Sequence, residues 1–178
     1  MDSLIVSNPM MKDWECMTDL LIEEPGPMEE GIDDGQETSL IKIMVCCTRQ
    51  SATGDPPVGR GSSRKVLSAR EPKQIQDDKI ALTSQFITTL PQLKYWHLPD
   101  PENMANLLII PQYFDLEIYT TGRQENALGS LLRLVQEVLD KQSDTDVLET
   151  AAKTLENSVM ISFQSSADVR LIGLACLT

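Results

Sequence analysis

Hydrophobic residues recur along the chain every three to four positions, and no segment alternates with the two-residue period of a β-strand. The spacing predicts helices over residues 10–23, 36–52, 77–90, 102–110, 111–122, 123–141 and 146–157. Two of these helices begin with capping signals, because Asp100 precedes Pro101 and either Ser143 or Asp144 precedes the last helix. Gly122 suits the left-handed position that ends a helix. The pattern therefore predicts an all-α fold.

The apolar stripes indicate which faces of the helices pack. In the first predicted helix the stripe is formed by Met10, Trp14, Met17 and Leu21. In the second it is formed by Leu40, Ile43, Met44 and Cys47. Ile41 and Val45 add apolar side chains outside this stripe, so the second helix is expected to have neighbours on two sides.

The last two predicted helices form an αα-hairpin around the capped turn QSDTD. Their apolar faces carry Leu128, Leu131, Leu132, Val135 and Leu139, and then Leu148, Ala151, Ala152 and Leu155. The two alanines are expected on the packing face, where small side chains let helices approach closely. Helix pairs joined by loops of varied length predict a HEAT-like α-solenoid fragment of antiparallel helix pairs. A closed helical bundle is the competing architecture.

Charge is distributed unevenly over the 178 residues, whose formal net charge is −12. Residues 1–40 carry eleven acids and one base, whereas residues 58–76 carry five bases and one acid. The bases are Arg60, Arg64, Lys65, Arg70 and Lys73, in a stretch expected to be a loop over residues 53–76. This basic loop is a candidate contact for the DNA backbone. The alternative is a phosphorylatable connector without a binding role, since Ser62, Ser63 and Ser68 lie among the bases.

The residues that could carry chemistry do not form a recognisable site. The run GRGSSRK lacks the spacing of a phosphate loop, the acidic pairs lack EF-hand spacing, and the four cysteines form no C-x-x-C motif. His97 is the only histidine. No stretch approaches the roughly 20 apolar residues of a membrane span. We therefore expect no catalysis, cofactor, metal, small-molecule substrate or membrane contact.

Three aromatic residues are the remaining candidates for a binding surface. Tyr113, Phe114 and Tyr119 lie close together in the sequence. Their spacing favours packing in the core and at its edge. The less favoured alternative is that these aromatic residues line a groove that binds a peptide of a partner protein.

Four longer runs, in this order, resemble the stromal antigen (stromalin, SA) subunit of cohesin and have an insect-like character. They are MKDWECMTDLLIEEP, PPVGRGSSRKVLSA, LIIPQYFDLEIYTTGR and DTDVLETAAKTLE. The resemblance extends over about residues 9–157 and matches an internal stretch of a long HEAT-repeat family. The run QYFDLEIYTTGR is the most specific of the matching segments.

The resemblance implies a nuclear, chromosome-associated protein without enzymatic activity. Members of the family bind the kleisin subunit of cohesin, associate with other cohesin subunits and contact DNA through basic surfaces. Sister-chromatid cohesion and chromosome segregation depend on them. A non-catalytic cohesin scaffold is therefore the first functional expectation for this chain. The alternative is a truncated protein-interaction fragment with no DNA role, whose acidic N-terminal third would pair with a basic partner.

The sequence also departs from the family at two places. The run LPQLKYWHLPDPENMANLL is shorter than its counterpart, and NSVMISFQSSADVRLIGLACLT does not follow the family's pattern. We expect a partial copy with a HEAT-like segment over residues 1–157 and a divergent tail over residues 158–178.

Overall fold

The computed structural model of the chain describes residues 9–22, 31–55, 70–97, 99–115, 118 and 125–165. Its elements are the 3-10 helix η1 (Pro9–Lys12), α2 (Trp14–Ile22), α3 (Asp34–Thr53), α4 (Arg70–His97), α5 (Pro101–Ile109), the 3-10 helix η2 (Ile110–Tyr113), α7 (Glu125–Lys141) and α8 (Thr145–Ser165). Within these ranges every regular element is helical, which confirms the predicted all-α fold.

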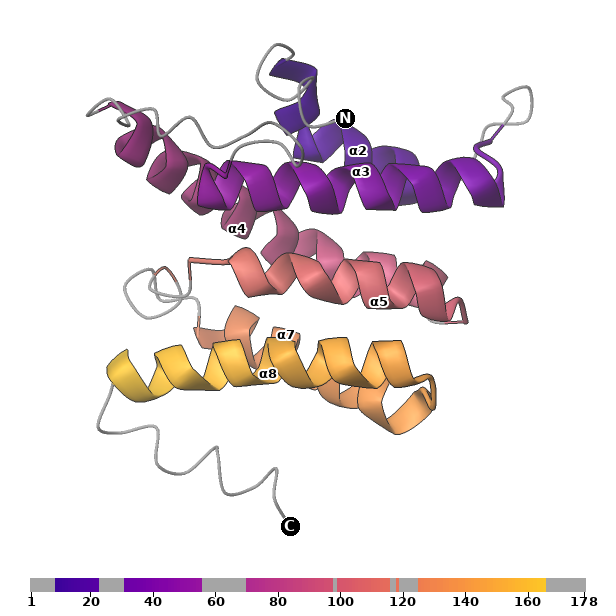
Figure 1. Cartoon of the computed structure of the whole chain (residues 1–178). Coiled ribbons are helices and arrows are strands. Elements are labelled where there is room, and N and C mark those ends of the chain that lie inside the picture. The colour runs from indigo at the N-terminus through magenta and orange to yellow at the C-terminus, as the bar shows by residue number, and fades with distance from the viewer. Residues whose placement is uncertain are drawn as a thin grey trace.

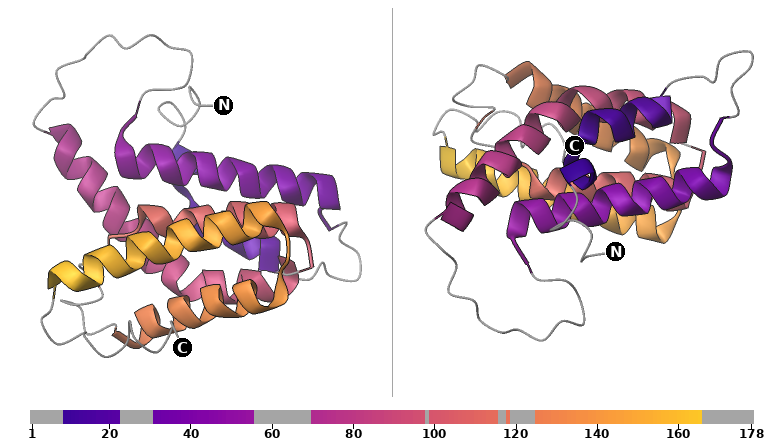
Figure 2. Two further views of the ribbon diagram at one scale, coloured as in Figure 1. Left: turned by 60° about the horizontal axis from the view of Figure 1, so that its bottom comes forward. Right: turned by 90° about the horizontal axis from the view of Figure 1, so that it is seen from above.

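The helices form two layers that run side by side along a short array. In one layer α4 packs against both α2 and α7, and in the other α5 packs against both α3 and α8. Figure 1 shows α3, α5 and α8 stacked in front, all running in the same direction, with α2, α4 and α7 behind them. The two views in Figure 2 show the same arrangement from below and from above. Pairs α2–α3, α4–α5 and α7–α8 therefore stack as repeats of a solenoid, as predicted.

Aspartate side chains start all three helices of the front layer. Asp33 Oδ1 accepts a hydrogen bond from the Gln36 N–H at 2.8 Å, and the Gln36 side chain accepts one from the Asp33 N–H at 3.1 Å. Asp100 Oδ1 accepts from the Glu102 N–H at 2.9 Å. Asp144 Oδ1 accepts from the Asp146 N–H at 2.9 Å, so Asp144 and not Ser143 is the cap. These carboxylates satisfy N–H groups that a helix start leaves unpaired.

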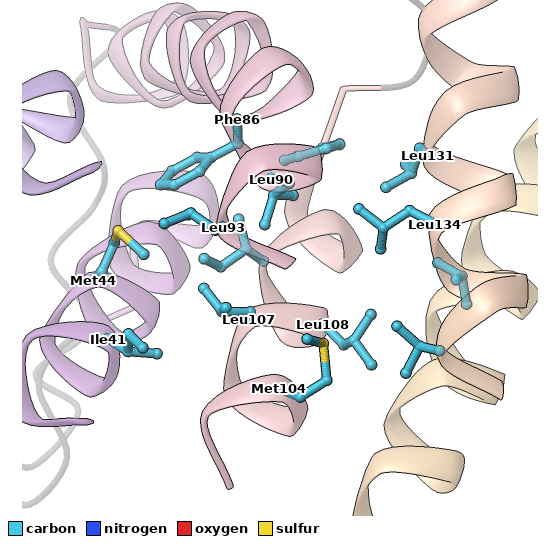
Figure 3. Packing of buried hydrophobic residues seen from close by; sticks show 14 of the residues in the cluster. Ile41, Met44, Phe86, Leu90, Leu93, Met104, Leu107, Leu108, Leu131 and Leu134 are labelled. Carbon is cyan, nitrogen blue, oxygen red and sulfur yellow. The ribbon is translucent and has the colours of Figure 1, made fainter. Parts of the chain in front are cut away.

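One continuous core runs along the array between the layers. Figure 3 shows its central part, with side chains from α3, α4, α5 and α7 pointing toward one another. The side chains labelled there are Ile41, Met44, Phe86, Leu90, Leu93, Met104, Leu107, Leu108, Leu131 and Leu134. All of them are buried and belong to a single cluster of contacting residues. Helix α3 contacts α2, α4, α5 and both 3-10 helices, which confirms its predicted need for neighbours on two sides.

Helix α4 is longer at both ends than the sequence pattern predicts. It begins at Arg70 rather than Asp77, and it continues through Pro91 to His97. A proline inside a helix removes one backbone hydrogen bond and usually ends the helix. Here Leu90 and Leu93 are both buried on either side of Pro91, so burial of these side chains outweighs the local cost.

The packing faces of two helices differ from their predicted stripes. Met10 is 72% exposed and lies in η1, because α2 begins only at Trp14, whose helix start is capped by Asp13. In α3 the fully buried apolar side chains include Ile41, whereas Leu40 and Ile43 are half-buried. A helix that is apolar on most sides gives periodicity little to distinguish, and its neighbours then decide the buried face.

The predicted short helix over residues 111–122 is also corrected where the structure describes it. Pro111–Tyr113 belong to the 3-10 helix η2, and Phe114 has an extended backbone with φ −66° and ψ 148°. Pro111 cannot donate to the carbonyl of Leu107, and that carbonyl instead accepts from the Ile110 N–H three residues on. Residues 119–122, including Gly122, lie outside the described ranges.

Candidate nucleic-acid and partner interface

The five basic candidates belong to the stretch of sequence that leads from the end of α3 into the start of α4. Helix α3 ends at Thr53, and Gly54 closes it in the left-handed conformation with φ 67° and its N–H bonded to Gln50 O at 2.9 Å. Residues 56–69, which hold Arg60, Arg64 and Lys65, lie outside the described residues. The predicted loop over residues 53–76 is too long, because Arg70 and Lys73 belong to the first turn of α4.

The two ends of this basic segment lie next to each other. A Cβ atom on Gly54 would lie 2.4 Å from Ile75 Cδ1, so the end of α3 touches the second turn of α4 directly. Another residue would be strained here, because φ is positive and its Cβ would displace the end of the Ile75 side chain. The segment therefore leaves and re-enters the array at a single edge.

Two of the first four residues of α4 carry the charge that a helix start disfavours. Arg70 and Lys73 lie at the positive end of the helix dipole, and the Lys73 side chain is exposed. The acids Asp77 and Asp78 follow in the next turn, where Asp78 accepts from Gln74 Nε2 at 2.9 Å and pairs with Lys12 of η1. Glu71 lies between the two bases, so the first turn carries two bases and one acid. The bases do not stabilise the start of α4 through the helix dipole.

The aromatic candidates divide between the core and the surface. The Phe114 ring is 3% exposed and lies in the core cluster, whereas the Tyr113 side chain is half-buried at the seam between η2 and α3. The pKa of the Tyr113 hydroxyl lies above its ordinary value, mainly because burial disfavours the charged form. The positive charge of Arg49 lowers this pKa in part, and the negative charge of Asp55 raises it. Tyr119 lies outside the described residues. Of the three, Tyr113 is the described residue with surface left for a partner.

A carboxylate that the sequence did not indicate ties the residue after Phe114 to the helix that carries Arg70 and Lys73. Asp115, which is 9% exposed, accepts a hydrogen bond from Gln76 Nε2 of α4. Its backbone N–H donates to Thr83 Oγ1 at 2.9 Å, and Thr83 Oγ1 donates to Lys79 O at 2.7 Å. The chain just after η2 is thereby tied to the second turn of α4. These partners are 32 and 39 residues apart, so no local motif could have indicated them.

A second polar contact that the sequence did not indicate joins the middle helix pair to the last one. The Thr154 hydroxyl of α8 lies 2.7 Å from Leu108 O and 2.9 Å from Thr150 O, both acceptors, and it accepts from Gln112 Nε2 at 3.2 Å. Leu108 O belongs to the last turn of α5, where carbonyls lose their helical partners. Thr154 therefore caps α5 from the neighbouring repeat.

Replacing Thr154 by valine keeps the side-chain shape but removes this cap. We expect the free energy of unfolding to fall by about 1–2 kcal/mol, because a buried carbonyl and the Gln112 amide each lose a partner. Chemical denaturation followed by circular dichroism measures the change. Thr88→Val is the matched control, since the exposed Thr88 hydroxyl bonds only within its own helix at 2.9 Å. Equal losses in the two variants would contradict a role between repeats.

Other kinds of site find no support in the part of the chain that the structure describes. No group of three or more histidine, cysteine, aspartate or glutamate side chains there could hold a metal ion. No described helix is both long enough and apolar enough to cross a membrane. Among the described cysteines, Cys16, Cys46 and Cys47 take part in no disulfide, and of these Cys47 is buried.

Comparison with known proteins places this two-layered array in a family. Residues 1–174 match the model of the cohesin subunit SCC3/SA HEAT-repeats domain. The chain belongs to the SCC3/SA family. Cohesin subunit SA-1 of Xenopus laevis is 51% identical over 148 residues, which are 83% of this chain and 12% of that protein. Cohesin subunit SA-3 of Rattus norvegicus is 44% identical over 145 residues, or 82% of this chain and 11% of that protein.

A more distant relative extends the likeness to nematodes. Cohesin subunit scc-3 of Caenorhabditis elegans is 37% identical over 153 residues, which are 85% of this SCC3/SA chain and 14% of that protein. The resemblance read from the four sequence runs is thus confirmed. The chain spans a small part, between a tenth and a sixth, of the length of these relatives. The division at residue 157 remains a prediction, and α8 passes it without a break.

Proposed function

We propose that this SCC3/SA chain is a non-catalytic scaffold that binds the kleisin subunit, associates with other cohesin subunits and supports cohesin on chromatin during sister-chromatid cohesion. Its place of action is the nucleus, on chromosomes. The family match and the printed names of the relatives, all cohesin subunits, support this role. The stacked helix pairs support it further, because a solenoid offers long surfaces for a partner rather than an enclosed active site.

Within this function we propose that Arg60, Arg64, Lys65, Arg70 and Lys73 contact the DNA backbone. The observation that carries this proposal is the presence of two of these bases at the start of α4, where they oppose the helix dipole. Contacts of this kind neutralise phosphates and release counterions, so binding would depend strongly on salt and little on sequence.

Replacing the five bases by alanine tests the DNA contact. We expect affinity for a duplex of about 20 base pairs to fall about tenfold or more at 50 mM salt, because each lost cation removes a phosphate contact. The slope of log affinity against log salt should become shallower by as much as about 4. Fluorescence anisotropy at several salt concentrations measures both quantities.

A variant with nearly the same change in net charge provides the control. Arg133→Glu with Lys141→Glu places new acids on exposed positions of α7, a helix of another pair. This variant should lose affinity only modestly. If the affinity for the duplex and the salt slope of the five-alanine variant are unchanged, the proposed DNA contact is wrong. The basic segment would then be a connector.

A specific observation favours a second candidate function, protein binding without a DNA role. The starts of α3, α5 and α8 lie at one edge of the array and carry acids (Figure 1). These acids are Asp33, Asp34, Asp100, Glu102, Asp144 and Asp146. Such an edge repels DNA and attracts basic segments of a partner. Capture of a kleisin fragment that survives in the five-alanine variant, but weakens as salt rises, would favour this candidate.

A further inference from the structure

The start of α4 depends on contacts with the rest of the array. Its first turn, REPK, combines two bases, which the helix dipole disfavours, with Glu71 and Pro72, which a helix start accepts. Three residues just after this turn contact other elements. Ile75 contacts Gly54 at the end of α3, Gln76 donates to Asp115 after η2, and Asp78 pairs with Lys12 of η1. Together they fix residues 75–78, directly after the additional turn that the apolar pattern does not predict.

The contact between Gln76 and Asp115 differs from the other two because it ties α4 to the exit of its own helix pair. Asp115 is held from the other side, since its backbone N–H donates to Thr83 and Thr83 donates to Lys79 O. Its side chain is 9% exposed, whereas Gln76 is an exposed residue. The fixed partner is therefore the carboxylate, and the glutamine is the side chain that it holds. A hydrogen bond to a carboxylate is stronger than one between neutral groups.

Gln76 lies one turn beyond Lys73, so both side chains leave neighbouring positions on the same helix surface. Any constraint on Gln76 therefore also constrains the turn that presents Lys73. We propose that the hydrogen bond between Gln76 and Asp115 positions the first turns of α4, so that Arg70 and Lys73 are presented from a fixed helix instead of a loop. Gln76 and Asp115 are positioning residues, and their effect on DNA rests on the DNA contact proposed above.

Amide hydrogen exchange of the full chain tests the positioning directly. The amides of residues 74–79 are the first in α4 that can donate within the helix. In Gln76→Ala they should exchange about 5- to 30-fold faster, the factor that corresponds to a loss of about 1–2 kcal/mol. Alanine is at least as good a helix former as glutamine, so faster exchange cannot reflect weaker intrinsic helix propensity.

Gln92→Ala is the matched control on the same helix. The exposed Gln92 amide donates only to Thr88 O, at 3.1 Å, and its loss should leave residues 74–79 unchanged. Asp115→Ala should reproduce the effect of Gln76→Ala, whereas Asp115→Asn keeps an acceptor oxygen and should restore most of the protection. Wild-type exchange in Gln76→Ala, or equal acceleration in Gln92→Ala, overturns the proposal.

Duplex binding separates this proposal from the DNA contact itself. If the five-alanine variant binds DNA as well as wild type, the DNA contact fails, while hydrogen exchange still decides whether Gln76 positions α4. If the five-alanine variant loses binding, Gln76→Ala, which keeps every base, should lose about threefold at 50 mM salt. Unchanged binding beside faster exchange overturns the claim that this hydrogen bond presents the bases to DNA.

Discussion

Replacing Phe86 by alanine is expected to lower the free energy of unfolding by about 3–5 kcal/mol. Phe86 is fully buried at the middle of α4, the helix that contacts α2, α3, α5 and α7. Its ring also meets the ring of Trp14 at a centroid distance of 6.0 Å and an angle of 52°. The cavity left by alanine would therefore open between helices of different repeats, where no single helix can shift to fill it.

Ile80→Ala is the control for Phe86, because it removes an apolar side chain from the same helix at a position that is 40% exposed. Its cost should stay below about 1 kcal/mol. Thermal melting measures both variants, and a loss of 3–5 kcal/mol would lower the melting temperature of a chain of this size by about 10 °C. A loss below about 1 kcal/mol in Phe86→Ala would contradict the packing described for the centre of the array.

The second large effect is expected from enlarging Ala151. This residue is fully buried on α8, on the face that packs against α5, and its neighbours Thr154 and Ser158 on that face are also small and buried. Leucine at this position would push the two helices apart or force side chains out of their preferred rotamers. We expect Ala151→Leu to cost about 3 kcal/mol, at the upper end of the range for overpacked cores.

Ala152→Leu makes the same chemical change one residue further along α8. Ala152 is exposed, although the sequence pattern placed both alanines on the packing face. The extra carbons would enter solvent there, so the stability should change by no more than about 0.5 kcal/mol. Denaturant unfolding of the two variants compares them directly, and similar costs would mean that the face of α8 against α5 is assigned wrongly.

The sequence pattern predicts the helices best where it combines a clear stripe with a capping residue. The start of α5 follows from Asp100 and Pro101, and the hairpin of α7 and α8 follows from its leucines and the turn at Asp144. In these segments local preference and tertiary packing agree, which is what makes a boundary readable from sequence alone.

The pattern fails where packing overrides a local signal. Pro91 indicates a helix end, yet burial of Leu90 and Leu93 carries α4 past it. In α3, apolar residues cover most of the circumference, so Leu40 and Ile41 are equally good candidates until α4 and α5 are in place. Such choices depend on neighbours that are distant in sequence, and helical periodicity carries no information about them.

For the candidate interface, the sequence predicts composition but not placement. The bases could be counted directly, and the helix that carries Arg70 and Lys73 could not be foreseen. The hydrogen bonds that tie Asp115 to α4 and join α5 to α8 link residues that are distant in sequence. Thr83 and Asp115 are 32 positions apart, and Leu108 and Thr154 are 46. Glutamine, threonine and aspartate are common on helix surfaces, so nothing in their local sequence marks these particular ones.

The stacking of α4 and α5 between the other two pairs also has a consequence for how the chain folds. Most of the described packing joins helices that are consecutive or belong to adjacent pairs, so few contacts require the closure of very long loops. A topology of this kind favours fast folding that spreads from one pair to the next. The middle pair is covered on both sides, so we expect the stability of its helices to depend on both neighbouring pairs. During synthesis, α4 and α5 would then reach their full stability only after α7 and α8 have left the ribosome.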